Sequence, residues 1–223
     1  TTVTVNVALV NADNTIYQAA GNTSITFTVE SNIPTPFNPL DISGISLWLD
    51  GTDPLNTGTA PADGAAITIW KDKSGLGHDS NGGTSAGLYD EDGINGMGVV
   101  SSTASNTNYL FPSTVLTSTD FTVFSVHRQI ADSPGPVWSY NTTDKSHWFP
   151  SFNGGSSYFS HGDSGWFERS PGLDTDRDYV GVGIFNNTGN EISNYIDGAI
   201  RETGTYSTTT TTQFGLGVRT GGY

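Results

Sequence analysis

From Ile42 to the end of the chain, short runs of apolar and aromatic residues alternate with clusters of Gly, Asn, Asp and Ser. Runs this short, bounded by turn-forming residues, predict β-strands rather than helices. The 28 glycines disfavour helices further, and the 25 aromatic residues are enough for a core. The sequence therefore predicts an all-β fold, a sandwich or jelly roll. The runs are residues 44–50, 65–70, 96–102, 108–112, 121–127, 136–140, 147–152, 157–161, 179–185, 193–198 and 213–219.

The segment before these runs has a different pattern. Residues 3–10 and 24–30 each alternate apolar and polar side chains, which is typical of half-buried strands. Three prolines then follow within SNIPTPFNPLD. Proline removes backbone donors and fixes φ, so this stretch is expected to be a semi-rigid linker. We predict a β-strand arm over 1–31, a Pro-rich linker over 32–40 and one domain over 41–223.

The charge of the chain limits its partners. The formal net charge is −14, from 22 acidic and 8 basic residues. Such a surface repels phosphate, so neither nucleic-acid binding nor membrane insertion is expected, whereas divalent cations would be attracted. No apolar run approaches the length of a membrane span, and Cys is absent. The chain begins at Thr1 without Met, as expected of a processed product or an excised piece.

Several segments occur in a characteristic order, namely GISLWLDGTD, ITIWKDKSGLGHDS, GINGMGVVSS, NYLFP, FTVFSVHR, SNYIDGAIRETG and FGLGVRTGG. In this order, residues 41–223 resemble the concanavalin A-like, laminin-G-type domain of bacterial and phage surface proteins. The resemblance implies a two-sheet antiparallel jelly-roll sandwich, with a tight turn at Asp197-Gly198. It also implies an extracellular, cell-surface or virion-surface location. Relatives continue beyond the position of Tyr223, so we expect residues 1–31 or a neighbouring subunit to cover an open edge.

The stretch WKDKSGLGHDS, residues 70–80, is expected to be a structural turn rather than a site. Trp70 should face inward, Asp72 should bind backbone N–H groups two residues on, and Gly75 should adopt positive φ. Lys71 and Lys73 are expected to point to solvent. On this interpretation, Asp72→Ala lowers stability by about 1 kcal/mol or somewhat more.

Residues 138–168 are the best candidate for a sugar site, because aromatic rings alternate there with hydrogen-bonding side chains. A sugar ring has an apolar face and a rim of hydroxyl groups, and this combination matches both. Trp138 and Phe149 are expected in the core. The alternative is that all the rings simply fill the core. The predicted carbohydrate-binding residues are Trp148, Tyr158, Trp166, Asn153, Asp144, His161 and Asp163.

A calcium site is predicted at DTDRD, where Asp174, Asp176 and Asp178 have the spacing of carboxylate ligands. The helix-loop-helix version is excluded, since Tyr179 and Phe185 stand where Gly and Glu would be needed. A non-helical Ca²⁺ site is one possibility, and a solvated acidic turn is the other. Asp90 and Asp92 present the same two alternatives.

Three functions are compatible with these features. The first is a non-enzymatic carbohydrate-binding or adhesion module that binds a glycan or polysaccharide surface. The second is a structural decoration, fibre or appendage subunit that contacts its neighbours through residues 1–31. The third is a polysaccharide-active glycoside hydrolase. Hydrolases resembling this fold carry Glu-x-Asp-x-x-Glu on one strand, and none of the five glutamates begins that motif, so catalysis is not expected.

Overall fold

The structure is a computed structural model that describes residues 37–81, 86–102, 109–130, 137–140, 146–152, 156–161, 165–169, 172–205 and 214–217. At residues 140, 146–152, 156, 158, 160–161 and 165–169, only the backbone is described. The chain divides into two units, with the boundary between Asp41 and Ile42. The described part of the first unit is a short 3-10 helix, η1 (Pro39–Asp41), and the two residues before it. The predicted arm over 1–31 lies outside the described residues.

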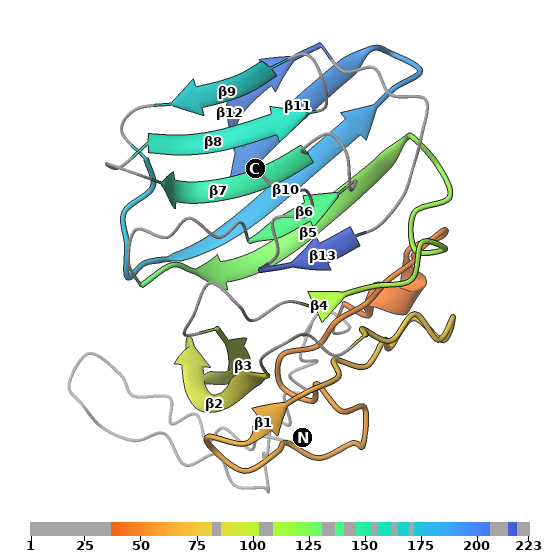
Figure 1. Cartoon of the computed structure of the whole chain (residues 1–223), viewed down its shortest axis with the longest axis vertical. Helices are drawn as coiled ribbons and strands as arrows, with labels where there is room; N and C mark the ends of the chain where they lie inside the picture. The colour runs from red at the N-terminus through yellow and green to blue at the C-terminus, as the bar shows by residue number, and fades with distance from the viewer. Residues whose placement is uncertain are drawn as a thin grey trace, which may run out of the picture. The chain divides into compact units, whose positions relative to one another are not determined.

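The second unit is built from antiparallel strands, so the prediction of an all-β antiparallel fold is confirmed. No helix in the described ranges is long and apolar enough to cross a membrane. Three sheets have the strand orders β1-β2-β3, β12-β11-β10-β5 and β4-β13-β6-β7-β8-β9 (Figure 1). The strands are β1 (Ala66–Ile67), β2 (Gly87–Ile94), β3 (Met97–Ser101), β4 (Tyr109–Leu110), β5 (Phe121–Arg128), β6 (Trp138–Tyr140), β7 (Ser146–Phe152), β8 (Ser156–His161), β9 (Gly165–Arg169), β10 (Asp178–Asn186), β11 (Glu191–Ile196), β12 (Ala199–Gly204) and β13 (Phe214–Leu216).

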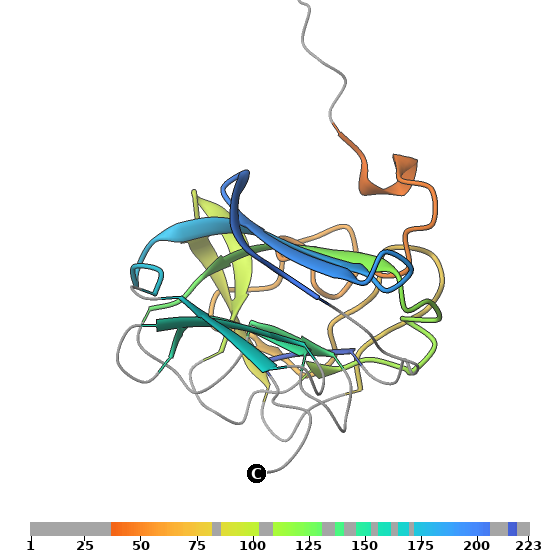
Figure 2. The ribbon, with the colours of Figure 1, turned by 90° about the horizontal axis from the view of Figure 1, so that it is seen from above.

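The four-stranded and six-stranded sheets form two layers that pack against each other (Figure 2). The ring of Phe185 in β10 lies 5.8 Å from the ring centres of both Trp138 and Phe159, which are themselves 5.9 Å apart. All three side chains are at most 2% exposed. Gly183 permits this packing, because a Cβ at that position would lie 2.9 Å from the Trp138 ring. The core between the layers is therefore aromatic.

Two tight turns have the geometry that their sequences favour. Asp197 and Gly198 both have positive φ, 50° and 79°, and they join β11 to β12 through a two-residue loop. Asn95 and Gly96 join β2 to β3 in the same way. Positive φ at both central residues matches the twist of the flanking strands, and Asn-Gly and Asp-Gly tolerate it best. The tight turn expected at Asp197-Gly198 is present.

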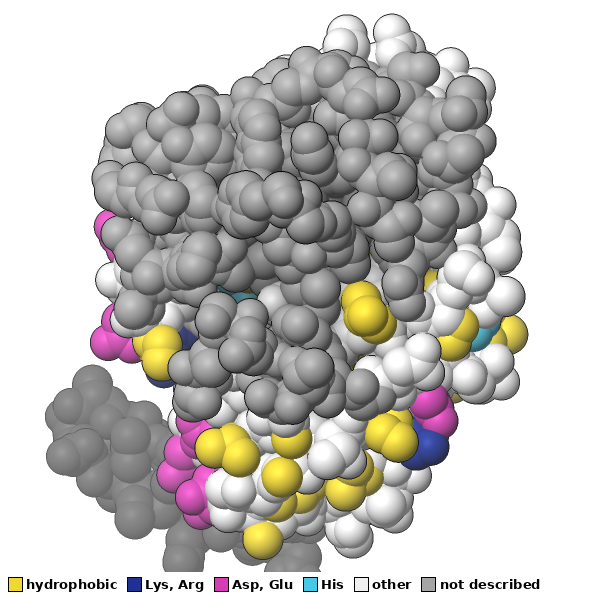
Figure 3. All heavy atoms as spheres, viewed as in Figure 1, with side chains coloured by type: hydrophobic (Ala, Val, Ile, Leu, Met, Phe, Trp, Pro, Cys, Tyr) yellow, Lys and Arg dark blue, Asp and Glu magenta, His cyan; other side chains and the backbone are white. Residues whose placement is uncertain are grey.

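Two expected strands differ from the structure. Residues 45–50 form no strand, and the run over 65–70 forms only the two-residue strand β1. By contrast, the acidic segment around Asp90 and Asp92 lies within β2 rather than in a turn. Viewed from the side of Figure 1, acidic and hydrophobic side chains gather on the surface over the region of β2 and β3 (Figure 3). Tertiary pairing has overridden local turn preference there.

Candidate functional site

The stretch over 70–80 is densely hydrogen-bonded around the carboxylate of Asp72. This carboxylate accepts the backbone N–H groups of Trp48, Ser74 and His78, at 3.1, 2.8 and 3.0 Å. It also accepts the Ser74 hydroxyl at 2.6 Å. Asp72 is 5% exposed, so these four bonds are shielded from water. One carboxylate thus holds three separate points of the backbone, and we call this arrangement the Asp72 hub.

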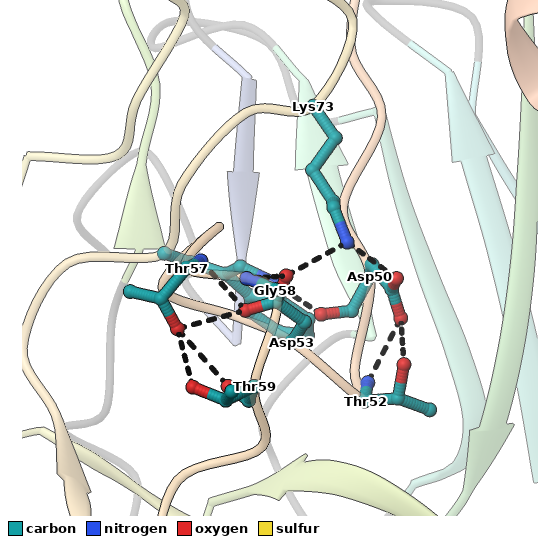
Figure 4. Close-up of polar contacts among 8 residues, drawn as sticks. Asp50, Thr52, Asp53, Thr57, Gly58, Thr59 and Lys73 are labelled. Carbon is teal, nitrogen blue, oxygen red and sulfur yellow. Dashed lines mark hydrogen bonds and ion pairs between the residues drawn. The ribbon is translucent and has the colours of Figure 1, made fainter.

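Lys73 lies beside the hub, between the carboxylates of Asp50 and Asp53 (Figure 4). Its ammonium Nζ is 2.8 Å from Asp50 Oδ2 and 3.1 Å from Asp53 Oδ2, and 5.5 Å from the centre of the Trp48 ring. The Lys73 side chain is only 16% exposed. The expectation that Lys73 points to solvent is therefore wrong. The sequence gives no local sign of this pairing, because Asp50 and Asp53 precede Lys73 by about twenty positions.

The two carboxylates that hold Lys73 are strongly favoured in the ionised form. Burial alone would raise the pKa of Asp53, but the N–H groups of Thr57 and Gly58 and the Lys73 ammonium outweigh it and lower the pKa below its usual value. Burial likewise opposes the charge of Asp50, and Lys73 and Thr52 lower its pKa. Burial would lower the pKa of Lys73, whereas the two carboxylates raise it. The three groups therefore stay charged together at neutral pH.

We expect Lys73→Met to lower the free energy of unfolding by about 2 kcal/mol, because it leaves two carboxylates partly buried without their cation. The matched control is Lys71→Met. Lys71 pairs with Asp79 at 2.6 Å, but its side chain is 42% exposed, and exposed pairs contribute about 0–1 kcal/mol. Urea denaturation of the two variants and the parent measures the difference. Equal losses in both variants would contradict the structural importance of the Lys73 pairs.

The other residues predicted for the turn also have structural positions. Gly75 has a φ of 88°, a conformation that suits glycine. The Trp70 ring is partly buried and meets the Tyr109 ring edge-on, at 5.7 Å and 77°. The Tyr109 hydroxyl in turn donates to the Ile67 carbonyl at 2.5 Å and accepts the Gly87 N–H at 3.0 Å. All these contacts serve to position backbone, and none leaves a reactive group facing a cleft.

The predicted sugar site falls largely outside the described residues. Asp144, Asn153 and Asp163 are not described at all, and His161 is described only as part of the β8 backbone. The strand positions of the predicted aromatic residues are described, although their side chains are not. They are Trp148 in β7, Tyr158 in β8 and Trp166 in β9.

The register of the six-stranded sheet divides these aromatic positions between its two faces. Directly paired residues share a face of a sheet, and successive residues alternate. Trp148 pairs with both Trp138 and Phe159, whose rings are in the core. Tyr158 and Trp166 belong to the rows that alternate with this one. Those two rows are Ser139–His147–Ser160–Trp166 and Phe149–Tyr158–Glu168.

The three aspartates of the predicted calcium site lie at the start of β10. Asp174 and Asp176 are exposed, and the Asp178 carboxylate accepts the Arg128 guanidinium at 2.6 Å. This arginine lowers the pKa of Asp178. Within the described residues, no group of three or more His, Asp or Glu side chains is arranged to hold a metal ion. Calcium binding at these positions stays a prediction.

A shallow cavity of about 360 Å³ lies beside this segment. Leu173 and Ile196 contribute apolar lining. Arg177 stands at the cavity with its guanidinium 4.9 Å from the centre of the Tyr179 ring, and it donates to Asp197 at 3.1 Å. The Asp197 carboxylate also accepts a backbone N–H. Because Arg177 and Asp197 form an ion pair, their charges neutralise each other at the cavity.

Comparison of the chain with known protein families, with curated proteins and with solved structures finds no match in any of the three. Function must therefore be argued from the residues and from the sheets that position them.

Proposed function

We propose that this protein is a non-enzymatic carbohydrate-binding or adhesion module with a concanavalin A-like jelly-roll fold, exposed on the surface of a bacterium or phage. Two facts about the fold support the jelly-roll interpretation. All the described sheets are antiparallel, and the two larger sheets pack against each other through an aromatic core. A fold alone does not define a function, so the proposal depends on one face of the six-stranded sheet.

The observation that carries the proposal is the register of β7, β8 and β9. It places the backbone positions of three aromatic residues, Phe149, Tyr158 and Trp166, in the rows that alternate with the row of Trp138 and Phe159, and those rows also contain Ser160 and Glu168. Diagonal neighbours on such a face are about 7–8 Å apart, a spacing suited to a sugar ring. Aromatic faces bind the apolar side of a sugar, and the interleaved polar groups bind its hydroxyls.

The test is binding of the purified chain to an array of immobilised polysaccharides and oligosaccharides, with and without EDTA. Trp166→Ala and Tyr158→Ala are each expected to reduce the signal at least tenfold, because loss of one stacking ring removes a large part of a weak binding energy. Loss of signal in EDTA would support Ca²⁺ as a cofactor at Asp174, Asp176 and Asp178. The matched control is Phe37→Ala, which truncates a ring that is 73% exposed elsewhere in the chain.

Two further results would change the proposed carbohydrate-binding function. An array on which the parent chain binds no glycan would contradict the proposal. Release of reducing sugars from a bound polysaccharide would instead support the third candidate, a glycoside hydrolase. Trp148→Ala is a useful comparison, since its row is shared with buried Trp138, and it should affect thermal stability more than glycan binding.

A structural decoration, fibre or appendage subunit is the second candidate. The observation that favours it is a large apolar area on the outer face of the four-stranded sheet, where Phe124 is 68% exposed. Exposed apolar areas on soluble proteins commonly mark contacts with other proteins. In this candidate, residues 1–31 would make the further contacts with neighbouring subunits.

A further inference from the structure

The outer face of the four-stranded sheet carries a continuous set of apolar side chains. One row across the sheet is Phe124–Val182–Tyr195–Ile200, and the next pairs Val126 with Val180. Alternate residues of β5 and β10 face the core, among them His127, Tyr179 and Phe185, so these two rows face away from it. The most exposed members are Phe124 (68%), Val126 (64%), Ile200 (57%) and Val180 (47%). We call these two rows the apolar face.

The two rows of the apolar face contain no charged residue, although the chain as a whole has a net charge of −14. Beside Val180, the charge of Asp197 is neutralised by Arg177 at 3.1 Å. The row on one side is also uncharged, and it consists of Thr122, Ile184, Ser193 and Thr203. The row on the other side is the pair Arg128–Asp178, whose charges neutralise each other at 2.6 Å. Two copies of so acidic a chain repel each other over most of their surface. They can approach without that cost at a neutral face such as this one.

We propose that the apolar face binds the same face of a second copy of this chain. A basic partner would bind the carboxylates elsewhere on the surface. A neutral apolar face is best complemented by a second neutral apolar face. In a two-fold arrangement each residue pair occurs twice, so a single favourable contact is doubled. Self-association through this face is independent of sugar binding, which we assign to the other sheet.

The two ends of the longer row, Phe124 and Ile200, favour one arrangement of the two copies. Phe124 stands on the edge strand β5, and Ile200 stands on the opposite edge strand, β12. A two-fold axis parallel to the strands brings Phe124 of one copy over Ile200 of the other. An axis across the strands would instead stack Phe124 on Phe124 and leave a gap beside them. Close packing therefore favours the axis parallel to the strands.

The size of the face sets the strength of the contact. Strands β5, β10, β11 and β12 are 8, 9, 6 and 6 residues long. At about 4.8 Å between strands and about 3.4 Å per residue, the whole outer face of the sheet, of which the apolar face is a part, covers roughly 500 Å². Stable complexes bury about 800 Å² per partner. The dimer should therefore be weak and dynamic, with a Kd on the order of 10–100 μM.

Sedimentation velocity of the full chain over a range of concentrations tests the association. We expect a shift from monomer toward dimer as the concentration rises, and at least a tenfold increase in Kd in Phe124→Asp. The matched control is Met97→Asp, on β3, which places the same charge at a side chain that is 52% exposed. A parent chain that stays monomeric up to millimolar concentration would overturn the proposal. Association that Phe124→Asp leaves unchanged would overturn it too, and would point to another segment such as residues 1–31.

The absence of cysteine permits a direct test of the arrangement. A chain carrying both Phe124→Cys and Ile200→Cys should form a disulfide-linked dimer under mild oxidation, seen on a non-reducing gel. Each single substitution should form much less. If Phe124→Cys alone is linked as efficiently as the double variant, the axis runs across the strands and the proposed contact is wrong.

Discussion

Asp72→Ala is expected to lower the free energy of unfolding by about 3–4 kcal/mol. The substitution removes four hydrogen bonds to an ionised, buried acceptor, and it leaves the N–H groups of Trp48 and His78 without that acceptor in a shielded position. Bonds to charged groups contribute about 1.5–3 kcal/mol each, and a buried unsatisfied donor costs about 1–3 kcal/mol. The pattern of a local turn predicts a loss of only about 1 kcal/mol, because it includes only the bond to Ser74.

Urea denaturation at neutral pH measures this loss. Asp72→Asn should lose less than Asp72→Ala, since the amide oxygen retains part of the acceptor geometry. Asp92→Ala is the control, because Asp92 lies exposed in β2 and its removal should change stability by no more than about 0.5 kcal/mol. A loss of 1 kcal/mol or less in Asp72→Ala would show that the hub does not hold Trp48 and His78 in solution.

The protein is also expected to lose about 3 kcal/mol of stability as the pH falls from 6.5 to 4. Burial of His127 in β5 lowers the pKa of its imidazole from 6.5 to about 4, although Asp197 and Ser125 partly oppose the shift. Between these two values the unfolded chain binds a proton at His127 that the folded chain does not. Stability from this residue is therefore complete above pH 6.5 and declines as the pH falls, by about 1.4 kcal/mol per pH unit.

The measurement is urea denaturation at several pH values between 7 and 4. His127→Gln should remove most of the decline, whereas His78→Gln should retain it. The carboxylates whose pKa is lowered, including Asp50, Asp53 and Asp72, begin to lose their contribution only near the acid end of this range, and that loss is common to the parent and both variants. The same decline in His127→Gln as in the parent would exclude His127 as its source.

The all-β character could be predicted because the signals are local. Short apolar runs with Gly and Asn between them favour β-strands joined by turns over any other secondary structure. Asp197-Gly198 forms the hairpin turn that such a pair favours. Where the observed strands differ from the predicted ones, contacts between residues distant in sequence determine the structure. Residues 45–50 alternate like a strand, yet the Trp48 N–H binds Asp72 and the Trp48 carbonyl accepts the Lys73 N–H. Pairing with β3 and β1 likewise makes a strand of β2 despite its acids and glycine.

The sites were less predictable than the fold. A period of two reveals which residues alternate, but it does not reveal which set faces the core. In β7, both sets contain an aromatic residue, and only the register distinguishes them, because Trp148 pairs with Trp138 whereas Phe149 pairs with Tyr158. The pairing of Lys73 with Asp50 and Asp53 had no local sequence signal either, because these residues are distant in sequence and meet only in the folded chain.

The Asp72 hub has a consequence for the way in which this protein opens. In the two large sheets, backbone groups pair mainly with each other along the strands. Around the hub, the backbone of Trp48, Ser74 and His78 depends on one ionised side chain. Protonation of Asp72 would weaken the bonds at all three points at once. In acid, the amide protons of this segment would exchange with solvent through a local opening. Those of β10 would exchange only through global unfolding.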